Sequence, residues 1–127
     1  MSLDARVAGN RTAIGYLGAE TPAANQPCGQ AALARNRELA GAGVLLEEDE
    51  TYRFDQIGRR LYYAYTPDGT WIEETLIREG LARAARTDAR YGAYLAALQA
   101  EAEAAGRGCL WETHPSDADG ALNQDQN

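Results

Sequence analysis

The segment from residue 59 to residue 80 constrains the fold of this chain more than any other. It begins with the aromatic run RRLYYAYT, which favours a β-strand, and the turn PDG at residues 67–69 closes that run. The sequence EETLIREG follows and predicts a two-turn helix with Leu76 and Ile77 facing inward and Gly80 ending it. The segment therefore predicts a strand, a turn and a helix in close succession.

The rest of the chain predicts strands before this segment and helices on both sides of it. The patterns predict a hairpin of strands 3–8 and 12–17, a helix 29–40, a strand beginning at 44, a short strand at 70–72, an extended piece 81–85, and a helix from an Asp88 cap to Gly106. This order indicates a small α+β domain around a curved sheet. A closed five-stranded barrel is an economical arrangement for such a sheet.

The length of 127 residues permits one domain with a core and is too short for two domains of ordinary size. We expect the domain to occupy residues 1–111 and a polar tail to occupy residues 112–127. No run approaches the roughly 18 apolar residues of a membrane helix, so we expect no membrane insertion. The N-terminus also shows no signal-peptide pattern.

Charge bears directly on the choice of partner. Twelve basic residues, all of them Arg, stand against 19 acidic residues, and the net charge is −7. Since affinity for polyanions comes mainly from cations placed against phosphates, this balance disfavours nucleic acid as a partner, while a local basic groove stays open. We expect the acidic run EEDE at residues 47–50 to be a solvated face.

The two cysteines, Cys28 and Cys109, lie far apart and lack the spacing of a zinc or redox motif. They predict either two buried thiols in a cytoplasmic protein or one disulfide in an exported protein. From the residues alone, both alternatives stay open.

Three passages resemble the staphylococcal nuclease (thermonuclease) family. They are YLGAETPA at 16–23, FDQIGRRLYYAYTPDGTWIEETLIREGLAR at 54–83, and EAEAAGRGCLW at 101–111. The middle passage is the most specific, because a Gly-Arg pair, an aromatic strand, an Asp-Gly turn and the following helix occur in the family's order. The resemblance implies an OB-type five-stranded barrel with three helices, in which the first strand would precede this chain.

The resemblance also implies a site for phosphodiester hydrolysis. In the family, two aspartates and a threonine carbonyl hold calcium, two arginines bind the phosphate, and a glutamate lies beside the attacking water. In this chain Glu20 falls at the second aspartate, Thr21 keeps the threonine, and Arg59 matches the second arginine. Glu20 and Thr21 are therefore candidate calcium ligands, and Arg59 is the candidate phosphate-binding residue.

Three family positions depart from this pattern. Gly15 stands at the first arginine, and Ala23 stands at the water-orienting glutamate. The D-G-D-T segment that carries the first aspartate would fall at Met1, and this chain does not contain it. We therefore expect either that the segment lies upstream of this start or that the chain has a reduced sheet with an open edge, through which two copies could pair as a homodimer.

Two functional hypotheses follow from these departures. The first, which we prefer, is a nuclease-like domain with a degenerate site that serves as a binding or interaction module. The second is an active calcium-dependent nuclease whose missing aspartate lies in an N-terminal strand upstream of this start and in which Arg11, Arg53 or Arg60 replaces the lost arginine. Simpler roles also stay open, with Glu20 as a solvated strand-end acid and Arg59 either paired with Asp55 or stacked on the tyrosine cluster.

The resemblance bears on the cysteines as well. In the family, the loop before the first helix lies close to the segment ahead of the closing tryptophan, and Cys28 and Cys109 occupy these two places. The resemblance therefore implies a disulfide between them and favours an exported bacterial protein, with a cytoplasmic one as the alternative.

Overall fold

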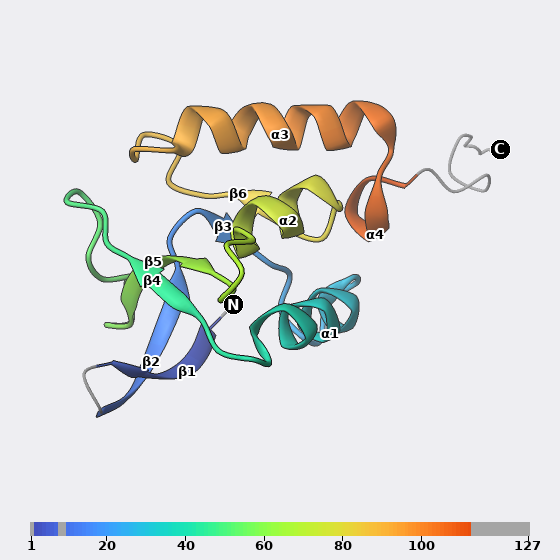
Figure 1. The fold of residues 1–127 in the computed structure, drawn as a ribbon. Coiled ribbons are helices and arrows are strands. Elements are labelled where there is room, and N and C mark those ends of the chain that lie inside the picture. The colour runs from blue at the N-terminus through green and yellow to red at the C-terminus, as the bar shows by residue number, and fades with distance from the viewer. Residues whose placement is uncertain (1, 8–9, 113–127) are drawn as a thin grey trace, which may run out of the picture.

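A computed structural model describes residues 2–7 and 10–112, with side chains from residue 13 onward. The expected tail beyond Glu112 lies outside the described residues. Ten elements follow one another along the chain: β1 (Ser2–Val7), β2 (Asn10–Tyr16), β3 (Ala19–Glu20), α1 (Gly29–Ala40), β4 (Leu45–Glu47), β5 (Arg60–Tyr65), α2 (Ile72–Arg78), β6 (Arg83–Ala84), α3 (Gly92–Ala105) and α4 (Gly108–Trp111). Figure 1 shows the four-stranded part of the fold below α2 and α3, with α1 to one side. The α+β class is confirmed.

The strands form two sheets. The larger has the order β1-β2-β5-β4, with β2 parallel to β5 and the other neighbours antiparallel. The smaller pairs β3 with β6, so that Glu20 stands opposite Arg83. The expected closed five-stranded barrel is not found among the described residues, because the chain leaves the larger sheet after Tyr16 and pairs next with β6. Strands β1 and β4 form the two edges of the larger sheet.

The helices and the segment before α2 differ from the sequence-based expectation at three points. The described residues contain four helices instead of three, because Gly108–Trp111 forms α4. The expected strand at 70–72 is wrong, since Trp71 makes a single bridge to Tyr65 and α2 begins at Ile72. Asp88 does not cap α3, whose N-cap is Tyr91. In the described part of the chain, no helix is long and apolar enough to span a membrane.

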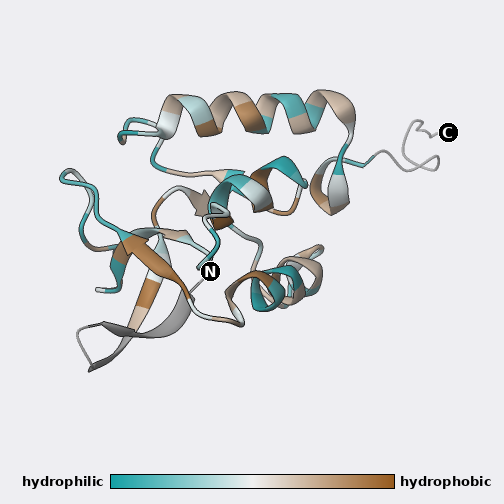
Figure 2. Ribbon diagram, viewed as in Figure 1, coloured by the Kyte–Doolittle hydropathy of each residue, from teal (hydrophilic) through white to brown (hydrophobic). Residues whose placement is uncertain are grey.

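Helix α2 lies at the centre of the main core. Ile72, Leu76 and Ile77 are completely buried, and they pack with Leu95 and Leu98 of α3. Figure 2 shows brown and teal segments alternating along α2 and α3, as expected for helices with one apolar side. Each buried aliphatic side chain contributes roughly 1.5 to 3 kcal/mol. The core therefore fixes the position of α2 relative to the strands that carry the site described below.

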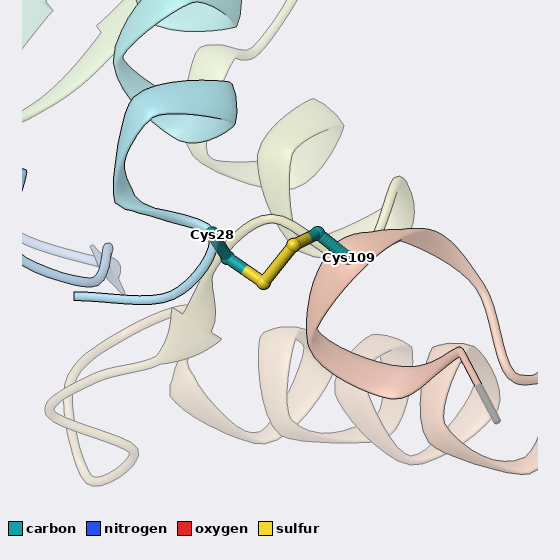
Figure 3. Close-up of a disulfide and its surroundings, with 2 residues drawn as sticks. All are labelled: Cys28 and Cys109. Carbon is teal, nitrogen blue, oxygen red and sulfur yellow. A yellow bond between two sulfur atoms is a disulfide. The ribbon is translucent and has the colours of Figure 1, made fainter. Parts of the chain in front are cut away.

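A disulfide joins Cys28 to Cys109, with a sulfur–sulfur distance of 2.01 Å. Figure 3 shows it connecting the start of α1 to α4. The segment before α4 can approach the end of α2 because residue 80 is a glycine. The φ of Gly80 is +76°, and a Cβ there would lie 1.9 Å from the carbonyl oxygen of Arg107. The pairing that the family resemblance implied is present in this structure.

The acidic run at residues 47–50 is not a solvated face throughout. Asp49 is buried and accepts hydrogen bonds from the Thr51 and Arg90 N–H groups and from the Tyr63 hydroxyl. Although burial raises the pKa of Asp49, these hydrogen bonds lower it below its ordinary value. The expectation is therefore wrong for Asp49, since one local donor and two donors from distant parts of the chain hold this carboxylate inside the protein.

Candidate functional site

An open pocket of about 540 Å³ lies where the end of β3 meets the turn before β5 and the segment after β6. Its charged lining residues are Glu20, Asp55, Arg59 and Arg86, and its uncharged lining residues are Tyr52, Phe54, Gln56 and Ile57. A second hollow of about 290 Å³ shares Glu20, Arg59 and Arg86 with the pocket and extends to Gly15. We refer to these two spaces together as the Arg59 pocket.

The sequence FDQIGR builds a tight turn that positions Arg59. Asp55 accepts hydrogen bonds at Oδ1 from the Ile57 N–H (3.0 Å) and the Arg59 N–H (2.9 Å). Gly58, with φ of +89°, allows the reversal, and a bridge between Phe54 and Arg60 closes it. The turn therefore fixes the backbone of Arg59 independently of the contacts that its side chain makes.

The same carboxylate also orients the Arg59 side chain. Arg59 Nε lies 2.5 Å from Asp55 Oδ2, and the Asp55 side chain is only 6% exposed. Burial raises the pKa of Asp55, but the hydrogen bonds from Arg59 and Ile57 bring it below its ordinary value. Arg59 thus pairs with Asp55, one of the simpler roles expected for it, and it still lines the pocket.

Of the two candidate calcium ligands, Glu20 lines the Arg59 pocket, and Thr21 lines a neighbouring hollow that also includes Glu20. Glu20 ends β3 with an exposed side chain, and Thr21 follows it in a half-buried position. Calcium takes six to eight oxygen ligands, usually with several carboxylates. Among the described residues, no three His, Cys, Asp or Glu side chains come together to hold a metal. Since Asp55 is already paired with Arg59, the described residues do not fit a calcium site.

Gly15 and Ala23 contribute no functional group. A Cβ built on Gly15 would lie 3.5 Å from Asp55 Oδ2 and 3.7 Å from Arg59 Cζ, so a side chain there would extend beside Arg59. Ala23 is exposed in the loop after Thr21. The structure thus places residue 15 at the pocket, as the resemblance implies, but with no side chain to bind a phosphate.

Two of the three proposed replacement arginines are engaged elsewhere. Arg60 Nη2 lies 2.5 Å from Glu48 Oε2, and Arg53 Nη1 lies 3.6 Å from Glu48 Oε1. The Arg60 guanidinium also lies 5.3 Å from the centre of the Phe54 ring. Neither arginine lines the Arg59 pocket. Arg11 belongs to β2, and its side chain lies outside the described residues.

Arg86 lines the pocket and was not predicted from the sequence. Its Nη1 donates to the carbonyl oxygens of Tyr16 (3.4 Å) and Leu17 (3.2 Å). Nothing in the local pattern LARAART distinguishes this arginine from its neighbours. The available signal was the short extended piece before it, whose pairing with β3 brings the following residues toward Glu20.

A buried carboxylate holds the loop between β2 and β3. Glu73 of α2 is 0% exposed and accepts hydrogen bonds from the N–H groups of Gly18 (3.2 Å) and Ala64 (2.8 Å). Burial raises its pKa to about 7 although the two hydrogen bonds favour the charged form. Glu73 therefore links α2 to β5 and to the loop that leads into Glu20.

Comparison with known proteins decides the family. The family described as staphylococcal nuclease homologue matches residues 13–113, which include Glu20, Arg59 and Arg86. This chain belongs to that family. The staphylococcal nuclease resemblance of the three sequence passages is thereby confirmed.

Two curated relatives come from Bacillus subtilis (strain 168). Endonuclease YncB is 43% identical over 84 residues, which cover 61% of this chain and 39% of that protein. The SPbeta prophage-derived endonuclease YokF is 44% identical over 84 residues, which cover 61% of this chain and 28% of that protein. The chain thus spans less than two fifths of the length of either relative.

Proposed function

We propose that this domain binds the phosphodiester backbone of nucleic acid at the Arg59 pocket and hydrolyses it slowly or not at all. The observation that carries this proposal is the fixed position of Arg59, which Asp55 orients in a pocket where residue 15 is a glycine. A guanidinium offers phosphate a planar set of donors and stays charged at any physiological pH. The site therefore keeps one binding group of a staphylococcal nuclease homologue.

Low turnover follows from the groups that the pocket lacks. Removing one fixed donor to a transition-state oxyanion lowers the rate by about 10²- to 10³-fold. An arginine on a transferring phosphate contributes about 10³-fold or more. By the family resemblance, Gly15 and Ala23 stand where the family has an arginine and a water-orienting acid. Even with strong non-additivity between these groups, little hydrolysis should remain.

Calcium has no step in this proposal, because Glu20 and Thr21 are not accompanied by enough oxygen ligands among the described residues. We assign Glu20 the role of a strand-end acid at the edge of the pocket. Its negative charge weakens phosphate binding, so the affinity should be modest and should fall as salt increases.

The compartment is part of the proposal. The disulfide between Cys28 and Cys109 supports an extracytoplasmic location, since such bonds persist mainly in oxidising environments. In that setting a domain of this kind would meet free nucleic acid outside the cytoplasm.

The test is binding of a fluorescein-labelled single-stranded oligonucleotide at low salt, followed by anisotropy. Arg59→Ala should weaken binding about tenfold through loss of a phosphate contact. Arg37→Ala is the matched control, because Arg37 is exposed on α1 and its loss changes the net charge equally. Equal affinities for the two variants would refute binding at the Arg59 pocket.

A second candidate is an active calcium-dependent nuclease. The relatives favour it, since both proteins are named endonucleases and are 43% and 44% identical over the aligned residues. Calcium-dependent cleavage that stops on chelation and is abolished by Arg59→Ala would establish this candidate.

A further inference from the structure

We infer that Arg86 is a second phosphate-binding residue of the Arg59 pocket and acts together with Arg59 on the same phosphate. This inference rests on the proposed function and adds a residue to its site. Arg86 lines both spaces of the pocket, and Arg59 and Glu20 are the other residues common to the two spaces. Two guanidinium groups therefore border one ligand-sized space.

The Arg86 side chain is held in place by uncharged hydrogen-bond acceptors. Its Nη1 donates to the carbonyl oxygens of Tyr16 and Leu17, which hold the guanidinium at the end of β2. Among the described side chains, residues 13–112, no carboxylate forms an ion pair with Arg86. By contrast, Asp55 pairs with Arg59. Arg86 is thus the pocket cation whose charge is not offset by an ion pair.

The backbone holds Arg86 in a conformation that disfavours this residue type. Its φ is +50°, a left-handed conformation that costs roughly 1 to 2 kcal/mol for a residue with a Cβ. The Ala85 N–H donates to the Gly18 carbonyl (3.1 Å), and the Ala89 N–H donates to the Arg86 carbonyl (2.9 Å). The position is therefore fixed on both sides, and glycine would adopt its backbone more easily. Strain of this kind is concentrated at functional sites.

The space that Arg86 borders is one that a side chain at residue 15 would enter. Gly15, Arg59 and Arg86 all line the hollow of about 290 Å³. A Cβ on Gly15 would lie 3.7 Å from Arg59 Cζ, so a larger side chain would extend into this hollow. Because residue 15 is glycine, it contributes no cation to this hollow, whose lining includes the two arginines Arg59 and Arg86. A phosphate on Arg59 can thus receive a second guanidinium from Arg86.

The test measures oligonucleotide affinity between about 20 and 200 mM salt. Arg86→Gln keeps a donor for the carbonyls of Tyr16 and Leu17 but removes the charge. We expect it to weaken binding about tenfold and to reduce the slope of log affinity against log salt by about 0.7, the value for one phosphate contact on a single strand. Arg37→Ala is the control with the same change of net charge.

A second variant, Arg86→Gly, separates binding from folding. Because glycine accepts the left-handed backbone, this variant should keep the unfolding midpoint close to that of the parent while it loses affinity as Arg86→Gln does. An Arg86→Gln affinity and salt slope equal to those of Arg37→Ala, with Arg59→Ala weakened, would overturn the role of Arg86 and leave the proposed function standing. If Arg59→Ala also equals the control, the proposed function itself fails.

Discussion

Asp55 accepts hydrogen bonds from both the backbone and the side chain of Arg59, at 2.9 Å from the N–H group and 2.5 Å from Nε. One carboxylate therefore fixes the turn and the guanidinium together. Under the proposed function, Arg59 is thus preorganised for phosphate, because little side-chain freedom is left to lose on binding.

Asp55→Asn tests this relationship. The amide cannot form the ion pair, and a hydrogen bond to a charged group contributes about 1.5 to 3 kcal/mol. We expect the free energy of unfolding to fall by about that amount and oligonucleotide affinity to fall three- to tenfold with Arg59 still present. Urea unfolding and anisotropy measure the two effects. Asp68→Asn, in the turn before α2, is the control and should leave affinity unchanged.

The buried carboxylate of Glu73 predicts a dependence of stability on pH. Since the folded state raises the pKa of Glu73 to about 7, the contribution of this group is fully present below its unfolded pKa near 4.5 and is lost as pH rises through 7. The loss should reach about 3 kcal/mol, at 1.4 kcal/mol per pKa unit.

Glu73→Gln isolates that contribution. The amide keeps one acceptor for a backbone N–H and does not titrate, so the decline in unfolding free energy between pH 5 and pH 8 should become much smaller. Urea unfolding at several pH values measures the decline. Glu103→Gln on the exposed side of α3 should decline as the parent does. An unchanged decline in Glu73→Gln would assign the pH dependence to other groups.

Gly15→Arg predicts a gain of affinity. The new side chain would start 3.5 Å from Asp55 Oδ2 and beside Arg59, and its Cβ would require Leu61 Cδ2, at 3.1 Å, to move slightly. We expect a stability loss of about 1 kcal/mol from this crowding and oligonucleotide binding tightened about tenfold. Gly15→Gln has a similar stem without the charge. If it tightens binding equally, charge at residue 15 is not the cause.

The disulfide predicts a large redox effect on stability. Cys28 and Cys109 are separated by 81 residues, and closing so long a loop contributes roughly 4 kcal/mol in the chain-entropy account. The double variant Cys28→Ser, Cys109→Ser should lose about 2 to 5 kcal/mol of unfolding free energy. Reduction of the parent should lower the urea midpoint to that of the double variant and leave the variant unaffected. A midpoint unchanged on reduction would contradict the prediction.

Local signals were sufficient for much of the fold. The aromatic strand before the Asp-Gly turn and the helix that ends before Gly80 were predicted close to their observed positions, because β propensity and a left-handed glycine act over a few residues. The hairpin of β1 and β2 was predicted for the same reason.

The sequence was least informative where the role of a residue depends on a partner far away along the chain. Asp88 accepts the Tyr52 hydroxyl at 2.6 Å instead of capping α3, and Tyr52 lies 36 residues away. Glu73 was not singled out from the sequence, because a carboxylate is usually exposed even on the same helix face as buried residues such as Leu76 and Ile77. Its two backbone donors come from β5 and the loop after β2. Such partners become visible only once the chain is folded.

The residues of the candidate site fall into the same two groups, those identified from local motifs and those that depend on distant partners. Arg59 and Glu20 were identified through short motifs that the family resemblance supplied, and both line the pocket. Arg86 could not be identified from a short motif. Its position depends on the pairing of β6 with β3 and on a left-handed backbone at a residue that is not glycine. The prediction of a closed barrel was wrong for a related reason, because closing a barrel requires pairing between strands that are far apart in the sequence.

The most direct test of the central claim is a single-turnover measurement, with excess protein over an end-labelled single-stranded oligonucleotide in millimolar calcium. Anisotropy in the same samples establishes that the strand is bound. The account predicts that the bound strand stays intact over the course of the reaction and that a chelator changes nothing. Rapid cleavage of the bound strand, stopped by the chelator and absent in Arg59→Ala, would contradict it.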